Sequence, residues 1–437
     1  MNQPVSGFSK KTKAEKIEWL AENYLQNNSD SVQILKNYWN EDASLQQLHD
    51  DFIENTLSNY YLPFGIAPNF LINDKLYALP MVIEESSVVA AASNAAKFWL
   101  ERGGFKAEVI STEKNGQIHL NFYGKEKSLE TFFEEVKPKL RESIQSIEKN
   151  MKSRGGGLLE LSLIDKSHIL DGYFYIHATF ETLDAMGANF INSCLEKMAQ
   201  VFEEEARHYE LFQKEEIFPE VVMSILSNYV PECLVRAEVS CKVDELTTKH
   251  HDGKQFAEKF VRAIEIAKTE TRRAVTHNKG IMNGIDAVVL ATGNDFRAVE
   301  AGVHAYAAKN NYYGSLTHAK IDDDTFTFWI ELPLAIGTIG GLTSLHPLTK
   351  LAFEILQKPD AKELMKIIAV AGLAQNFAAV RSLVTTGIQK GHMKMHLMNI
   401  MNQMQATKDE KSKALVYFKE NAVSHSSVEA FLKELRS

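Results

Sequence analysis

The sequence of 437 residues has 45% hydrophobic and 24% charged residues and a formal net charge of -9. This composition is typical of a globular protein, and the length predicts two domains because one hydrophobic core rarely grows this large. The negative charge and the lack of a long basic block argue against nucleic acid as a partner. The N-terminus has no apolar signal core and no apolar run reaches the length that spans a bilayer, so we expect a cytoplasmic protein without a membrane partner. Cys194, Cys233 and Cys241 lack metal-ligand spacing and are typical of reduced packing residues.

The first elements are predicted to be helical, over residues 9–60. Ser9 is a candidate cap for the first helix, and a second helical pattern covers residues 44–57. Residues 61–80 contain three prolines and predict a loop with short strands. Residues 86–104 then predict a buried helix that begins after two serines and ends at two glycines.

A change of periodicity follows at residue 117. Strands are predicted over 117–124, 158–164, 173–181 and 221–228, and helices over 128–152 and 184–209. This βαββαβ order is that of a ferredoxin-like module, which we place at residues 109–228. The most polar stretch of the chain, residues 273–300, lies after this module. We therefore expect the module to be a small domain inserted into a larger one.

The helix start at 184–189 is a candidate phosphate site. Small residues there allow a phosphate to approach backbone N–H groups, which the helix dipole favours. The residues are Asp184, Ala185, Met186, Gly187, Ala188 and Asn189. The alternative is an Asp that caps a closely packed helix. Because no GxGxxG follows a strand, a Rossmann site is not indicated.

The most polar stretch runs over 273–300, where three glycines interrupt a lysine, a histidine, three asparagines and two aspartates. Buried polar groups need partners, so a polar ligand is one explanation. A strand or short helix over 287–291 would return Asp295 to the pocket of Lys279. The alternative is two loops joined by a satisfied ion pair.

The last segments offer a Gly-rich loop at 335–341, a helix with Gln375 and Asn376, and two histidines, His392 and His396. The i, i+4 histidine spacing suggests a metal, but no third ligand accompanies it, so we predict no metal and keep a general acid or a surface pair as alternatives. The polar residues 403–437 predict a peripheral, mobile tail.

Several of these segments occur in one order along the chain that is typical of a known enzyme family. They are EESSVVAAAS, DAMGAN, THNKGIMNGIDAVVLATGNDFRAVEAG, GLAQN and GHM. Together they resemble the 3-hydroxy-3-methylglutaryl-CoA reductases of the soluble bacterial class, class II, over residues 50–400. One departure is IENTL at 53–57, where the family commonly has ENVIG, although Glu54 and Asn55 remain.

The resemblance implies an α+β fold. It has a large, mainly helical acyl-CoA domain, an inserted ferredoxin-like cofactor domain and a C-terminal flap. The corresponding boundaries are 1–108 and 229–387 for the large domain, 109–228 for the small domain and 388–437 for the flap. Family members form homodimers or dimers of dimers, with the active site at the subunit interface.

The implied reaction is the four-electron reduction of hydroxymethylglutaryl-CoA to mevalonate and CoA, through mevaldyl-CoA and mevaldehyde. In the cell it serves either mevalonate synthesis or mevalonate degradation. The resemblance assigns a buried Lys279 to the oxyanion, Asp295 to orienting that lysine, Glu85 to proton supply and His392 to the departing CoA thiolate. Substrate-binding residues would be Ser87, Arg273, Asn283, Gln375 and Asn376, and Asn228 would bind the nicotinamide amide.

The cofactor preference depends on one short segment. Lys152 and Arg154 suit a 2′-phosphate and favour NADPH, whereas Glu148 suits a ribose diol and favours NADH. We favour NADPH. Two other functions remain open: a non-catalytic regulator that binds acyl-CoA or nucleotide, and an acyl-CoA thioesterase that uses His392 and Asp295.

Overall fold

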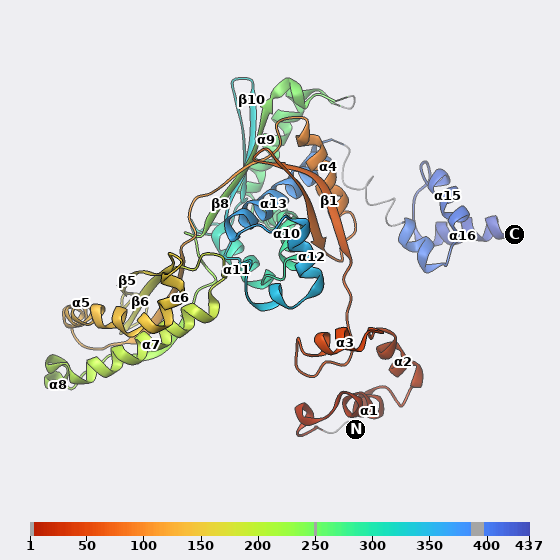
Figure 1. Cartoon of the computed structure of the whole chain (residues 1–437). Coiled ribbons are helices and arrows are strands. Elements are labelled where there is room, and N and C mark those ends of the chain that lie inside the picture. Colours follow the sequence, from red (N-terminus) through yellow and green to blue (C-terminus); the bar gives the residue numbers. More distant parts are fainter. Residues whose placement is uncertain (1–3, 249–250, 386–396) are drawn as a thin grey trace. The chain divides into compact units, whose positions relative to one another are not determined.

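The structure is a computed structural model that describes residues 4–248, 251–385 and 397–437. It divides into two compact units, Met1–Pro63 and Phe64–Ser437 (Figure 1). The predicted four-part division of the chain remains a prediction.

The N-terminal unit contains the elements η1 (Phe8–Lys10), α1 (Lys13–Tyr24), α2 (Ser29–Asn37) and α3 (Ala43–Asp50). Thr12, not Ser9, caps α1, because its hydroxyl accepts from Glu15 N while the Glu15 carboxylate accepts from Thr12 N. The helix predicted over 44–57 ends at Asp50, after which the chain turns.

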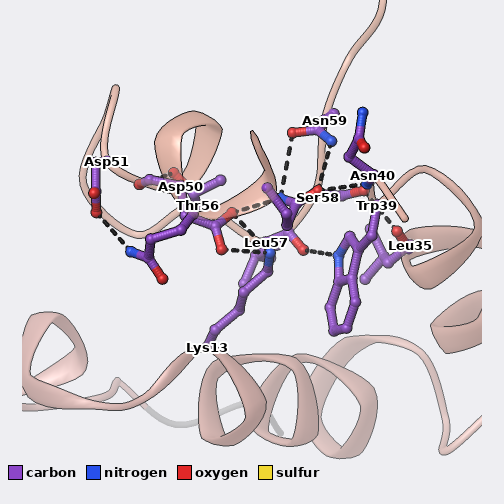
Figure 2. Close-up of polar contacts among 12 residues, drawn as sticks. Lys13, Leu35, Trp39, Asn40, Asp50, Asp51, Thr56, Leu57, Ser58 and Asn59 are labelled. Carbon is purple, nitrogen blue, oxygen red and sulfur yellow. Dashed lines mark hydrogen bonds and ion pairs between the residues drawn. The ribbon is translucent and has the colours of Figure 1, made fainter. Parts of the chain in front are cut away.

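Polar contacts hold this unit together, as Figure 2 shows. Lys13 Nζ pairs with Asp50 Oδ1 at 2.7 Å and lies 4.3 Å from the Trp39 ring centroid. The Trp39 indole donates to Leu57 O at 2.9 Å, and the Ser58 hydroxyl donates to Leu35 O at 2.6 Å. Tertiary polar bonds thus connect short helices that bury little apolar surface of their own.

The large domain combines a hairpin, a four-stranded sheet and a set of helices. The hairpin strands are β1 (Phe64–Ile72) and β2 (Lys75–Val82), joined at Asn73 and Asp74, which both have positive φ. The sheet has the order β3-β8-β10-β9, with β3 (Lys106–Val109), β8 (Leu234–Lys242), β9 (Thr317–Asp322) and β10 (Thr325–Pro333). The remaining elements are α4 (Val88–Leu100), η2 (Val243–Leu246), α9 (Gly253–Thr269), α10 (Thr271–Ala291), α11 (Phe296–Ala307), η3 (Gly341–Ser344), α12 (Pro347–Ile355) and α13 (Ala361–Val384).

α13 is the central element of this core. Its residues from Ile367 to Phe377 are all buried, and the helix packs against α10, α4 and β8 (Figure 1). By length and composition α13 could cross a membrane, contrary to the expectation that no such stretch exists, but 67% of its apolar window is buried inside the protein. Such burial is typical of a core helix.

α10 is one unbroken helix through Gly280 and Gly284, two of the glycines that were expected to interrupt this stretch. A Cβ at Gly284 would lie 2.4 Å from Ala371 O on α13, so this glycine permits close helix packing. Asp295 follows as the N-cap of α11, accepting from the backbone N–H groups of Arg297 and Ala298.

The small domain confirms the predicted βαββαβ order. Its elements are β4 (Lys114–Asn121), α5 (Glu126–Ser143), α6 (Gln145–Lys152), β5 (Gly157–Asp165), β6 (Tyr173–Glu181), α7 (Ala188–His208), α8 (Glu210–Glu215) and β7 (Glu220–Leu226). The antiparallel sheet has the order β5-β6-β4-β7, and α5 and α7 pack together on it around a separate hydrophobic core (Figure 1). The α+β class with an inserted ferredoxin-like module is therefore correct.

The C-terminal residues form helices where the sequence predicted a peripheral tail. A helical stretch over 397–403 precedes α15 (Lys408–Tyr417) and α16 (His425–Arg436). These helices share a small core, and Arg436 donates to both oxygens of Glu410 at 2.7 and 3.1 Å. Hydroxyl caps at Thr407 and Ser424 explain how so polar a sequence begins two helices.

Candidate active site

A lysine–glutamate pair connects two elements of the large domain. Lys279, in the middle of α10, donates from Nζ to the carboxylate of Glu85, which lies just before α4. The side chain of Lys279 is 60% exposed and that of Glu85 is 36% exposed, so Lys279 is not buried within one chain as predicted. Both groups can still reach a ligand.

A cavity of about 640 Å³ adjoins this pair, a volume typical of small-molecule sites. Four residues predicted to act in the site line it: Glu85, Ser87, Asn283 and Gln375. Ser87 has the N-cap position of α4 and a φ of 74°, but its hydroxyl makes no capping bond and, among the described residues, remains available. Gln375 is buried, and its side-chain oxygen finds no hydrogen-bond partner among the described residues. A donor from a ligand would satisfy that oxygen.

Two cations at the cavity were missed in the sequence. Lys259 on α9 and Arg381 on α13 both line it. Arg381 is half-buried, and burial together with the neighbouring Arg102 guanidinium lowers its pKa. Its guanidinium lies 4.6 Å from the centroid of the Phe98 ring. The only signal in the sequence was its place on the helix that carries Gln375, and a cation there suits an anionic ligand group.

A buried hydrogen-bond chain begins at Arg273, in the first turn of α10. Arg273 Nη2 makes a long 3.5 Å bond to His277 Nδ1, and His277 Nε2 lies 2.6 Å from Thr317 Oγ1. Thr317 donates to Asn376 Oδ1 at 3.1 Å, and Asn376 Nδ2 donates to His277 O at 3.3 Å. Because the Thr317 proton goes to Asn376, Nε2 of His277 must carry the ring proton and Nδ1 must accept. Burial, and then the Arg273 charge, lower the pKa of His277 to about 3, so the ring is neutral.

This hydrogen-bond chain changes the role expected for two predicted substrate-binding residues, Asn376 and Arg273. Asn376 is 1% exposed and both its amide oxygen and its amide nitrogen have a protein partner, so in this structure it supports the interior and does not line the cavity. Arg273 is also outside the cavity lining, but its guanidinium has no ion-pair partner within the described parts of the chain, and burial lowers its pKa. An anion is the natural complement to Arg273.

Within a single subunit, Asp295 does not lie near Lys279. Lys279 is twelve residues before the end of α10, which is about 18 Å along a helix axis. Asp295 instead pairs with Arg297 at 3.1 Å. Burial raises the pKa of Asp295, but the hydrogen bonds from Arg297 and Ala298 outweigh it and hold the pKa below the usual range. The reason is that residues 287–291 continue the helix of Lys279, where a separate strand or short helix was expected to return Asp295 to the same pocket.

The predicted phosphate loop is packed against the Gly-rich loop. Ala185 forms a bridge with Ile339, and Asp184 O accepts from Thr338 N at 2.8 Å. The Asp184 carboxylate accepts from Ala361 N at 2.9 Å, so it serves the start of α13 and does not cap α7. Gly187, with a φ of 94°, is the N-cap of α7. The backbone of this turn is thereby fixed.

The other predicted cofactor residues fall into two places. Met186, Ala188 and Asn228 line one small crevice. Glu148 is fully buried, accepting from Leu158 N at 2.5 Å and pairing with Lys152 at 2.7 Å. It is therefore not placed to bind a ribose diol, because its carboxylate already serves the turn before β5.

Arg154 differs from its neighbours. It is exposed, and its guanidinium donates to Asn150 O and Met151 Sδ but forms no ion pair among the described residues. Among the three candidates it is the one whose charge is available to a ligand. His392 and the flap residues beside it lie outside the described residues, so their predicted roles stay predictions.

Comparison with known structures defines the class of protein. The fold is similar to the class II 3-hydroxy-3-methylglutaryl-CoA reductase of Streptococcus pneumoniae bound to NADPH, with a TM-score of 0.72 and 35% identity over 87% of this chain and 100% of that one. A second structure of the enzyme from the same organism gives a TM-score of 0.73 and 32% identity, over 99% of this chain and 100% of that one.

Sequence comparison gives the family. The pattern described as Hydroxymethylglutaryl-coenzyme A reductase matches residues 12–397, and the chain belongs to this family of oxidoreductases. The reductase of Archaeoglobus fulgidus is 36% identical over 89% of this chain and 86% of its own length. A probable reductase of Borreliella burgdorferi is 38% identical over 81% of this chain and 79% of its own.

Proposed function

We propose that this protein reduces 3-hydroxy-3-methylglutaryl-CoA to mevalonate and CoA in two hydride transfers, with NADPH as the cofactor. The observation that carries this proposal is the Lys279–Glu85 pair at the edge of a cavity lined by Ser87, Asn283 and Gln375. The bound cofactor supplies hydride, and the residues of the chain bind the substrate, stabilise charge and move protons.

Lys279 provides the charge that each hydride transfer requires. Addition of hydride to a thioester or an aldehyde leaves an alkoxide oxygen, and an ammonium held beside it stabilises that charge. Glu85 holds Lys279 in place and is close enough to pass a proton along the same hydrogen bond. The unsatisfied oxygen of Gln375 suits the substrate hydroxyl, and Arg273 suits its carboxylate.

CoA leaves as a thiolate after the first reduction, and we assign its protonation to His392. An imidazolium is an apt donor to a thiolate near neutral pH. The cations Lys259 and Arg381 on the cavity wall suit the phosphate groups of CoA.

We infer that two subunits complete each site. Lys279 is exposed and lies far along α10 from Asp295. Asn294, next to Asp295, accepts from Gly337 N at 2.8 Å, in the loop that packs on the phosphate turn. Asp295 therefore lies beside the cofactor loop of its own chain, and a second copy would bring an Asp295 to Lys279.

NADPH is supported by the free charge of Arg154 and by the NADPH-bound reductase of similar fold. A cytoplasmic location and assembly as a homodimer or dimer of dimers belong to the same proposal.

The test of the proposal follows NADPH oxidation and free CoA together. Two NADPH consumed for each CoA released is expected, with mevalonate as the product. CoA release without NADPH oxidation would mean a thioesterase, and binding without turnover would mean a regulator. Either result overturns the proposal.

A mixing experiment tests the shared site. Lys279→Ala and Asp295→Ala subunits should each be inactive alone. After unfolding and refolding as a mixture, hybrid dimers regain one intact site, so about a quarter of wild-type activity should return if dimers form at random. No recovery would place Lys279 and Asp295 in the same subunit's site.

A further inference from the structure

A buried lysine, Lys114, lies under the turn at residues 184–189, which is the predicted phosphate loop. Lys114 begins β4 and is 4% exposed. Its Nζ donates to Thr182 Oγ1 at 2.6 Å and to Ala185 O at 3.3 Å. Both acceptors are neutral, and no acidic side chain within residues 4–248, 251–385 or 397–437 forms an ion pair with it. A buried ammonium whose charge is not compensated costs free energy, so it requires an explanation.

The surroundings of Lys114 indicate which charge it awaits. Thr182 Oγ1 also donates to Ala185 O at 2.7 Å, so the lysine, the threonine and the turn form one hydrogen-bonded unit. Lys114 lines the same small crevice as Met186, Ala188 and Asn228. That crevice lies at the N-terminus of α7, a helix of 21 residues whose dipole also favours an anion.

We propose that Lys114 is a binding residue for the pyrophosphate of the nicotinamide cofactor. Of the three N–H bonds of an ammonium, two have acceptors here and one remains for a phosphate oxygen. This inference rests on the proposed function. Because NADPH and NADH share the pyrophosphate, Lys114 acts on both cofactors equally, in contrast to Arg154.

The first experiment measures dissociation constants for NADPH and NADH, by cofactor fluorescence, in Lys114→Met. Methionine has a similar length and is apolar, so the buried position should tolerate it. We expect both constants to rise by about 10- to 100-fold, as for loss of a charge-assisted hydrogen bond. Inorganic pyrophosphate should compete with the cofactor in the wild type and do so at least 10-fold less well in the variant.

Thr182→Val is the matched control, because it removes the acceptor in the turn and keeps the ammonium. Its cofactor affinities should stay within about threefold of the wild type. If Thr182→Val and Lys114→Met weaken both cofactors alike, Lys114 serves only as a clip for the loop and the inference is wrong.

Lys114→Gln is a second variant that separates the charge from the hydrogen bond, because glutamine keeps a donor to Ala185 O and loses the charge. Affinity close to that of Lys114→Met is expected, and full recovery would overturn the role of the charge. If the wild type binds neither cofactor, the proposed function fails. If it binds both and Lys114→Met binds them equally well, only this inference fails.

Discussion

Acid should destabilise the large domain through His277. Burial, and then the Arg273 charge, place the pKa of this imidazole at about 3 in the folded protein, against about 6.5 in an unfolded chain. The unfolded state therefore binds more protons below pH ~6.5. His277 therefore leaves the free energy of unfolding unchanged above pH ~6.5 and lowers it progressively as the pH falls toward 3. Well below pH ~6.5 each pH unit costs about 1.4 kcal/mol, so about 2 kcal/mol is lost between pH ~6.5 and ~4.5.

His277→Gln isolates this effect. Glutamine can accept from Arg273 and donate to Thr317, so the chain of bonds can persist without a titrating ring. Urea unfolding followed by tryptophan fluorescence, to which Trp99 in the large core contributes, measures the free energy of unfolding at several pH values. The free energies of wild type and variant should diverge below pH ~6.5, with the wild type falling more steeply.

Exposed His425→Gln should follow the wild type throughout and serves as the control. Equal pH dependence in wild type and His277→Gln would refute the reasoning, because it would mean that His277 can ionise in the fold without cost.

Three other predictions concern the site and its support. Lys279→Met should lower the rates of both thioester and mevaldehyde reduction by about 10²- to 10³-fold, because both steps form an oxyanion, and near-normal turnover of either substrate would remove the lysine from the mechanism. Arg154→Ala should raise the Michaelis constant for NADPH about tenfold and leave that for NADH unchanged, whereas Lys152→Ala should do less because Lys152 pairs with Glu148; equal effects on both cofactors would contradict this. Asp286→Asn should raise the melting temperature at pH ~8.5 and not at pH ~4. Burial, and then the nearby Glu300 carboxylate, raise the pKa of Asp286 to about 8, so its stability cost grows as the pH rises from about 4 to 8.

Much of the small domain could be predicted from the sequence. Strands and helices there have clearly different hydrophobic periods, and the strands β4 and β6 bury alternate residues, so the βαββαβ order follows from pattern alone. The motif residues Glu85, Ser87, Asn283 and Gln375 were also identified, and the structure brings them to one cavity.

Tertiary contacts explain what the sequence did not show. Glycine usually signals a turn, yet Gly284 lies inside α10 because a second helix backbone needs its space. The sequence also did not distinguish a buried lysine from an exposed one. Lys114 and Lys152 look alike in sequence, but one is buried under a turn and the other is paired on the surface.

The close approach of α10 and α13 has a consequence for inhibitor chemistry. With α10 unbroken and fixed to α13 at Gly284, Asn283 and Gln375 belong to a single stiff floor under the cavity. A compound bound there meets a surface that is already in its final shape, and little affinity is lost in ordering it. Within a series of analogues, differences in affinity at this floor should therefore report directly on the contacts of each added group.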